Sequence, residues 1–179
     1  MPGDGMAAFE RWRQTVTSAD ANTEAPVDWE AFESSIGLRL PTDYKAYLDV
    51  YGVGCVNDLL CVRHPTVEKG AYNLLRAPTG ENRHLLSSSP LRLGIGRDRL
   101  MLCADGEGNQ LYWNTSDTDP DKWPVVLGDD SGRAWLAYDL TMVEFLLALF
   151  TGRLPDLGFA EAGFVDDEIV IECRPRNRR

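Results

Sequence analysis

Three aspartates alternate along one short stretch of the sequence, and their spacing matches the start of a calcium-binding loop. Asp117, Asp119 and Asp121 would supply carboxylate oxygens, the ligands that Ca²⁺ prefers. Such a loop also needs glycine at its sixth position and glutamate at its twelfth, where this chain has Lys122 and Gly128. We therefore predict no metal here and interpret the three carboxylates as exposed charges on a loop.

Other catalytic signals in the sequence are weak. The two histidines, His64 and His84, belong to no metal-binding or protease motif. The stretches 52–54 and 94–96 are G-x-G fragments, too short for a dinucleotide fingerprint, and the chain has no P-loop or G-x-S-x-G motif. We predict no catalytic residue and no cofactor, and therefore a protein that is not an enzyme.

The four cysteines are spaced in a way that fits neither a zinc site nor a C-x-x-C redox pair. Cys55, Cys61 and Cys103 fall within apolar, strand-like segments. Cysteine without a partner behaves as a small buried hydrophobe in such surroundings. We therefore expect these three to be buried free thiols.

A larger group of acids surrounds the alternating aspartates. Residues 105–130 contain seven acids against a single base, Lys122, and all of them lie in expected turns or between expected strands, so they could gather along one rim of a sheet. The candidate partner-binding residues are Asp105, Glu107, Asp117, Asp119, Asp121, Asp129 and Asp130.

Aromatic side chains lie close to these acids in the sequence. An acidic rim around aromatic anchors suits recognition of a basic protein partner. The alternative is that Tyr112, Trp113 and Trp123 belong to the core and that the acids are solvated turn residues.

Composition narrows the class of partner. The chain has 179 residues, which suits one domain, and its net charge is −10. Its acidic body would repel a phosphate backbone, so we expect no nucleic acid, whereas a basic protein would be attracted. Acidity also keeps a protein soluble, which is an equally simple explanation. The longest strongly apolar run, 145–150, is too short for a bilayer, and the first residues lack an apolar signal core, so we expect a cytoplasmic protein without a membrane partner.

Helix signals dominate the first third of the chain. Apolar spacing predicts a helix over residues 6–18, followed by a polar linker. Asp28 then suits the N-cap of a second helix, whose apolar face includes Trp29, and Gly37 suits its end. A third helix is expected from Pro41 to Gly52.

Strand signals follow, and then one more helix. Residues 55–63 resemble a first strand, and two hairpins are expected over 100–113 and 124–138, with Trp135 as a core anchor like Trp29. Thr141 and Glu144 form a capping box that opens the last helix. Residues 168–172 could add an edge strand. The order predicts an α+β fold, with helices packed on one mostly antiparallel sheet.

Two blocks of residues resemble the SUKH superfamily, which includes bacterial toxin-immunity proteins and a fungal cell-wall assembly regulator. The first block runs from Trp29 to Gly54 and the second from Leu111 to Leu146, and the resemblance as a whole spans roughly Trp29 to Gly152. The motif positions, for which we expect structural roles, are Trp29, Glu33, Gly37, Pro41, Tyr44, Gly52, Gly54, Trp123 and Trp135. The resemblance suggests three segments: an N-terminal helix and linker (1–26), a SUKH-like domain (27–152) and a C-terminal extension (153–179) with a basic, disordered end.

The resemblance implies a non-enzymatic protein-binding domain. The first hypothesis is an immunity protein that neutralises a toxin, often a nuclease, by binding its basic domain. The second is a regulatory or scaffolding module of the same fold. The third, a small-molecule binder or enzyme, would use a cleft between the helices and the sheet.

Overall fold

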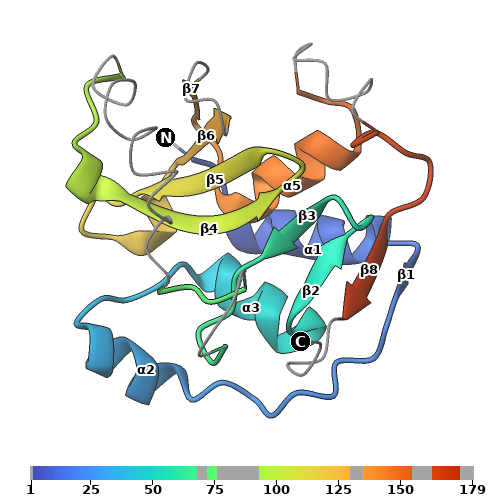
Figure 1. The fold of residues 1–179 in the computed structure, drawn as a ribbon, viewed down its shortest axis with the longest axis horizontal. Coiled ribbons are helices and arrows are strands. Elements are labelled where there is room, and N and C mark those ends of the chain that lie inside the picture. The colour runs from blue at the N-terminus through green and yellow to red at the C-terminus, as the bar shows by residue number, and fades with distance from the viewer. Residues whose placement is uncertain (1, 68–71, 76–92, 130–134, 155–162, 174–179) are drawn as a thin grey trace.

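The computed structural model describes residues 2–67, 72–75, 93–129, 135–154 and 163–173. Within this part of the chain, four α-helices accompany an eight-stranded sheet (Figure 1). The helices are α1 (Gly5–Thr15), α2 (Trp29–Ile36), α3 (Thr42–Tyr51) and α5 (Met142–Phe150). The strands are β1 (Ser18–Ala19), β2 (Gly54–Val56), β3 (Leu60–Val62), β4 (Leu100–Gly106), β5 (Asn109–Asn114), β6 (Val125–Asp129), β7 (Trp135–Tyr138) and β8 (Val170–Cys173). This arrangement confirms the α+β prediction.

The sheet has the order β1-β8-β2-β3-β4-β5-β6-β7, and among the pairs of these described strands only β1–β8 is parallel. The last described strand therefore lies between the two-residue strand β1 and the hairpin strand β2. A strand was expected at residues 168–172, but its expected place at the edge is wrong, because β1 covers it.

The main core lies between the sheet and the helices α1, α3 and α5, which Figure 1 shows on one side of the strands. Trp12, Tyr44 and Trp113 are among its largest buried side chains. Strand residues alternate between the two faces, so Tyr112 points away from this core into a smaller cluster with Trp135. Trp135 is therefore a core anchor as predicted, but on the opposite face of the sheet.

Helix α2 lies at the margin of the fold. Its N-cap, Asp28, and its left-handed end residue, Gly37 (φ 66°), are those that the sequence predicts. None of its residues is fully buried, however. Trp29 is only partly buried: its ring lies edge-on to that of Tyr44, with 5.9 Å between the ring centres, and its indole N–H donates to Asp49. It packs against the margin of the main core and is not a buried core anchor, which corrects the prediction in part.

The expected single strand at residues 55–63 is instead the hairpin β2–β3. Residues 57–59 connect the paired Val56 and Leu60, and the Leu59 N–H donates to the Val56 carbonyl at 2.9 Å. The two central residues of that turn, Asn57 and Asp58, both have positive φ angles, 49° and 59°, as a turn of the mirror-image type requires. The hairpin brings Cys55 directly opposite Cys61, and the two form a disulfide. Free thiols were expected at both positions, and that prediction is wrong. Of the three cysteines for which a free thiol was expected, Cys103 alone is a buried free thiol.

Candidate partner-binding site

The three aromatic residues near the acids belong to the interior. Tyr112, Trp113 and Trp123 are at most 2% exposed. Of the two interpretations drawn from the sequence, the core interpretation is therefore correct for them. Trp123 still positions the acidic loop, because its indole N–H donates to the Asp117 carbonyl at 2.7 Å.

The candidate acids do not share one rim. The β4–β5 turn and the end of β6 lie together, since Asn109 pairs with Asp129, whereas the β5–β6 loop leaves the opposite end of the same strands. Asp105, Glu107 and Asp129 consequently belong to one end of the sheet. Asp117, Asp119 and Asp121 belong to the other, and Asp130 lies outside the described residues.

Asp105 forms an ion pair with a buried arginine, Arg63. The Arg63 side chain is 7% exposed, and its Nε and Nη2 atoms donate to the two Asp105 oxygens at 3.2 and 3.0 Å. Its Nη1 donates to the Asn73 carbonyl at 2.9 Å. A buried guanidinium needs such a bidentate partner, because an unpaired charge in the interior is costly. The Asp105 carboxylate therefore has a structural role, because both of its oxygens bind Arg63.

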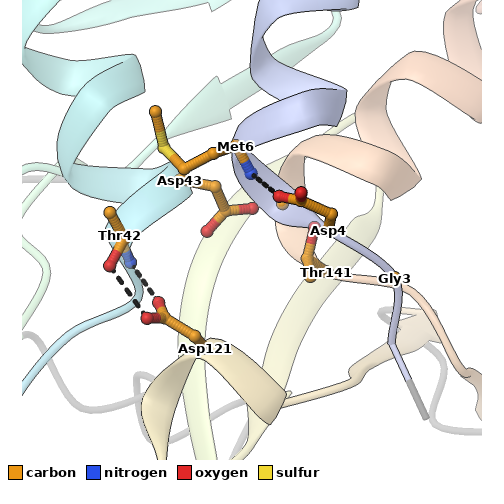
Figure 2. Close-up of a pocket in the computed structure, with 8 residues that line it drawn as sticks. Gly3, Asp4, Met6, Thr42, Asp43, Asp121 and Thr141 are labelled. Carbon is orange, nitrogen blue, oxygen red and sulfur yellow. Dashed lines mark hydrogen bonds between the residues drawn. The ribbon is translucent and has the colours of Figure 1, made fainter.

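The other end of the sheet meets a pocket of about 220 Å³, where the N-termini of α1, α3 and α5 converge (Figure 2). Three carboxylates line it: Asp4, Asp43 and Asp121. Asp121 accepts the Thr42 N–H at 2.6 Å and the Thr42 hydroxyl at 2.9 Å, and Asp4 accepts the Met6 N–H at 3.1 Å. Each helix start thus has a negative partner, which offsets its dipole and its free N–H groups.

Asp43 is the buried member of this group. Its two oxygens accept the Tyr44 N–H at 2.8 Å and the Val143 N–H at 3.1 Å, so it joins the start of α3 to the start of α5. Burial raises the pKa of Asp43, and the negative charge of Asp121 adds to that effect. A raised carboxyl pKa in a pocket is one mark of catalysis. For Asp43, the two backbone N–H groups that it accepts give its buried carboxylate a structural role. The Thr42 hydroxyl, which also lines the pocket, donates to Asp121.

The loop that supplies Asp121 carries the more accessible acids. Asp117 is exposed and accepts the Asp119 N–H at 2.8 Å. The Asp119 side chain is 43% exposed, accepts the Asp121 N–H at 3.2 Å and lies 3.4 Å from the Lys122 ammonium. These hydrogen bonds hold the backbone of the loop, and the carboxylates of Asp117 and Asp119 remain exposed to solvent. Within the described ranges, no cluster of three or more His, Cys, Asp or Glu residues could hold a metal ion.

The motif residues of the first block build the scaffold around this site. Glu33 accepts the Leu40 N–H and the Lys45 ammonium, at 2.8 and 2.9 Å. The Tyr44 hydroxyl donates to the Arg63 carbonyl at 2.7 Å. Pro41 is the N-cap of α3, one place before the position expected for it, and Gly52 ends that helix with a φ of 65°.

A protein-family model described as SMI1-KNR4 cell-wall, SUKH_6, matches residues 27–141. The chain belongs to this SUKH family. The match begins just before α2 and ends at the N-cap of α5, so it contains the acidic loop and the motif residues. No curated protein and no solved structure matches the chain.

Membership in the SUKH family supports a role in protein interaction at the level of the family. Among the residues with described structure, no helix is long and apolar enough to cross a membrane.

Sequence reasoning did not select Asp4 or Asp43 as site residues. The signal for Asp43 was its place at the start of a helix after Pro41, where an acid is favoured.

Proposed function

We propose that this SUKH protein is an immunity protein, a non-enzymatic domain that neutralises a toxin by binding it directly. The observation that carries the proposal is the family match over residues 27–141. The net charge of −10 adds to it, because a toxin that acts on nucleic acid presents a basic surface.

We assign the binding surface to the β5–β6 loop, and within it to Asp117 and Asp119. These two carboxylates remain accessible, whereas Asp105 is paired with Arg63 and Asp121 binds the start of α3. Charged groups at the rim of an interface mainly raise the association rate and set its dependence on salt. The loop would therefore steer a basic toxin domain toward this end of the sheet.

The experiment that tests the function is purification of the tagged full-length chain from its native cells, followed by mass spectrometry of bound proteins. One stoichiometric partner whose toxicity this chain abolishes would support the immunity proposal. Several weak partners without toxicity would instead support the regulatory or scaffolding alternative.

The proposed surface is tested by the double variant D117N/D119N. Asparagine keeps the oxygen that accepts each backbone N–H in the loop but removes the charge. We expect the association rate with the partner to fall by roughly tenfold at low salt, with less loss at high salt.

The matched control is E107Q. Glu107 is also an exposed acid in a turn, but it lies at the opposite end of the strands. Association measured by surface plasmon resonance at two salt concentrations separates the two variants. Equal losses per charge removed, two in the double variant and one in E107Q, would show that overall charge, and not this loop, guides binding.

A further inference from the structure

The disulfide in the β2–β3 hairpin has one buried and one accessible half. Cys55 is fully buried, whereas Cys61 is partly exposed. Of the two residues only Cys61 has exposed surface, so a thiolate from solution would approach the disulfide from the Cys61 side. Exchange rates depend on which sulfur can be reached and on how well the other one leaves.

Tyr72 supports the leaving sulfur. Its hydroxyl lies 3.7 Å from Cys55 Sγ, and a disulfide sulfur has no hydrogen, so the tyrosine must be the donor. Burial raises the pKa of Tyr72, and the charge of Asp105 adds to this, so the hydroxyl keeps its proton at neutral pH. Negative charge that develops on Cys55 would be stabilised by this bond.

The hairpin also holds the C-terminal strand. Cys55 pairs with Glu172 of β8 on one side, and Cys61 pairs with Asp105 of β4 on the other. Asn57 in the turn accepts the Val170 N–H at 2.7 Å and donates to the Glu168 carbonyl at 3.0 Å. The disulfide therefore lies at the junction between β8 and the strands that belong to the family match.

We propose that Cys61 is a site of thiol–disulfide exchange, at which a small thiol or dithiol opens the Cys55–Cys61 disulfide in the folded protein and loosens β8.

The reaction balances as two exchanges. An external thiolate bonds to Cys61 Sγ as the sulfur–sulfur bond breaks, and Cys55 leaves as a thiolate that takes a proton from water. A second external thiol releases Cys61 and forms the external disulfide, so two electrons pass to the protein. Closure is the reverse reaction, with a small-molecule disulfide as the oxidant.

The first test maps the site of exchange. The full chain is purified without reductant, incubated with glutathione under native conditions, quenched in acid and analysed by peptide mass spectrometry. We expect the glutathione adduct on Cys61. Cys103 is an internal negative control, because it is fully buried and burial raises the pKa of its thiol.

The outcomes that would overturn the proposal are distinct. A chain whose cysteines are all alkylated without reductant has no disulfide. An adduct mainly on Cys55 contradicts the direction of attack, and reduction only after unfolding makes the disulfide a fixed crosslink.

Y72F tests the leaving group. We expect the initial rate of opening by glutathione to fall about threefold or more, because the hydrogen bond to Cys55 is lost. Y138F is the matched control, since the Tyr138 hydroxyl is buried and has no hydrogen-bond partner in the described structure. Equal rates in wild type and Y72F would remove Tyr72 from the proposal.

The consequence for β8 is tested in the double variant C55S/C61S. We expect its melting temperature to fall by about 5 °C, because a short crosslinked loop is released. Amide exchange should accelerate over 170–173 and stay unchanged in α5. Unchanged protection of β8 would show that the disulfide does not control this strand.

Discussion

Glu33 joins two helices through a single carboxylate. It belongs to α2, and it binds both the Leu40 N–H ahead of α3 and the Lys45 ammonium within α3. Burial alone would raise the pKa of Glu33, but these two partners and the positive charge of Arg39 together outweigh it and hold the pKa below its ordinary value of 4.5. The ionised carboxylate is therefore favoured in the folded state.

This shift predicts a pH dependence. Because the folded pKa of Glu33 lies below the unfolded one, its contribution to stability is complete above about pH 4.5 and is lost as the pH falls through the folded value. E33Q should lower the free energy of unfolding by about 1–2 kcal/mol at pH 7, and by less near pH 3. Urea denaturation at both pH values measures the difference.

E30Q is the control for this prediction, because Glu30 is an exposed carboxylate in the same helix. Asp43 changes in the opposite direction: its raised pKa means that its ionisation costs stability as the pH rises. Comparing E33Q with wild type at each pH cancels that effect. A loss in E33Q that is the same at pH 3 and pH 7 would contradict the assigned role of Glu33.

Single residues were the least predictable level of this structure. The acids of residues 105–130 are alike in sequence, yet Asp105 pairs with Arg63 and Asp121 binds the start of α3. Such assignments depend on contacts between distant segments, which local patterns do not contain. The Cys55–Cys61 disulfide was missed for a related reason, since Asn57 and Asp58 were interpreted as part of one apolar strand.

At the scale of elements, helix ends were predictable because their chemistry is local. The capping box at the start of α5 is present as expected: the Glu144 N–H donates to the Thr141 hydroxyl at 3.4 Å, and the Thr141 N–H donates to Glu144 at 2.9 Å. Glu144 also accepts the Gly3 N–H at 3.1 Å, which connects this box to the segment before α1. That second contact links residues far apart in the chain, and no local pattern indicated it.

T141A tests the capping box. Loss of the cap should lower the free energy of unfolding by about 1 kcal/mol, whereas T141S, which keeps the hydroxyl, should recover most of it. S35A removes an exposed hydroxyl from α2 and should change stability by less than about 0.5 kcal/mol. Chemical denaturation compares all three variants. No difference between T141A and T141S would show that the hydroxyl contributes nothing.

At the scale of the whole molecule, the helix that precedes the family match in the sequence, α1, packs against the helix that follows it, α5. Helix α1 contacts α5 and α3, and its Phe9 and Trp12 lie in the main core. The division into 1–26, 27–152 and 153–179 stays a prediction about sequence organisation. The packing leads us to propose that these segments fold as one unit.

W12A tests this unit. Trp12 is fully buried and lies 6.2 Å from the ring centres of both Tyr47 and Phe150. We expect a loss of about 3–5 kcal/mol and a single unfolding transition. Q14A changes an exposed residue of the same helix and should be nearly neutral. Two transitions in W12A, with one unchanged, would indicate an independently stable domain.

The pairing of α1 with α5 has a consequence during protein synthesis. A ribosome adds roughly 5–20 residues per second, so α5 leaves the exit tunnel on the order of ten seconds after α1. Throughout that interval Trp12 lacks Phe150, one of the rings that cover it in the finished fold. Until α5 has emerged, the nascent chain therefore presents part of the apolar face of α1, to which molecular chaperones can bind.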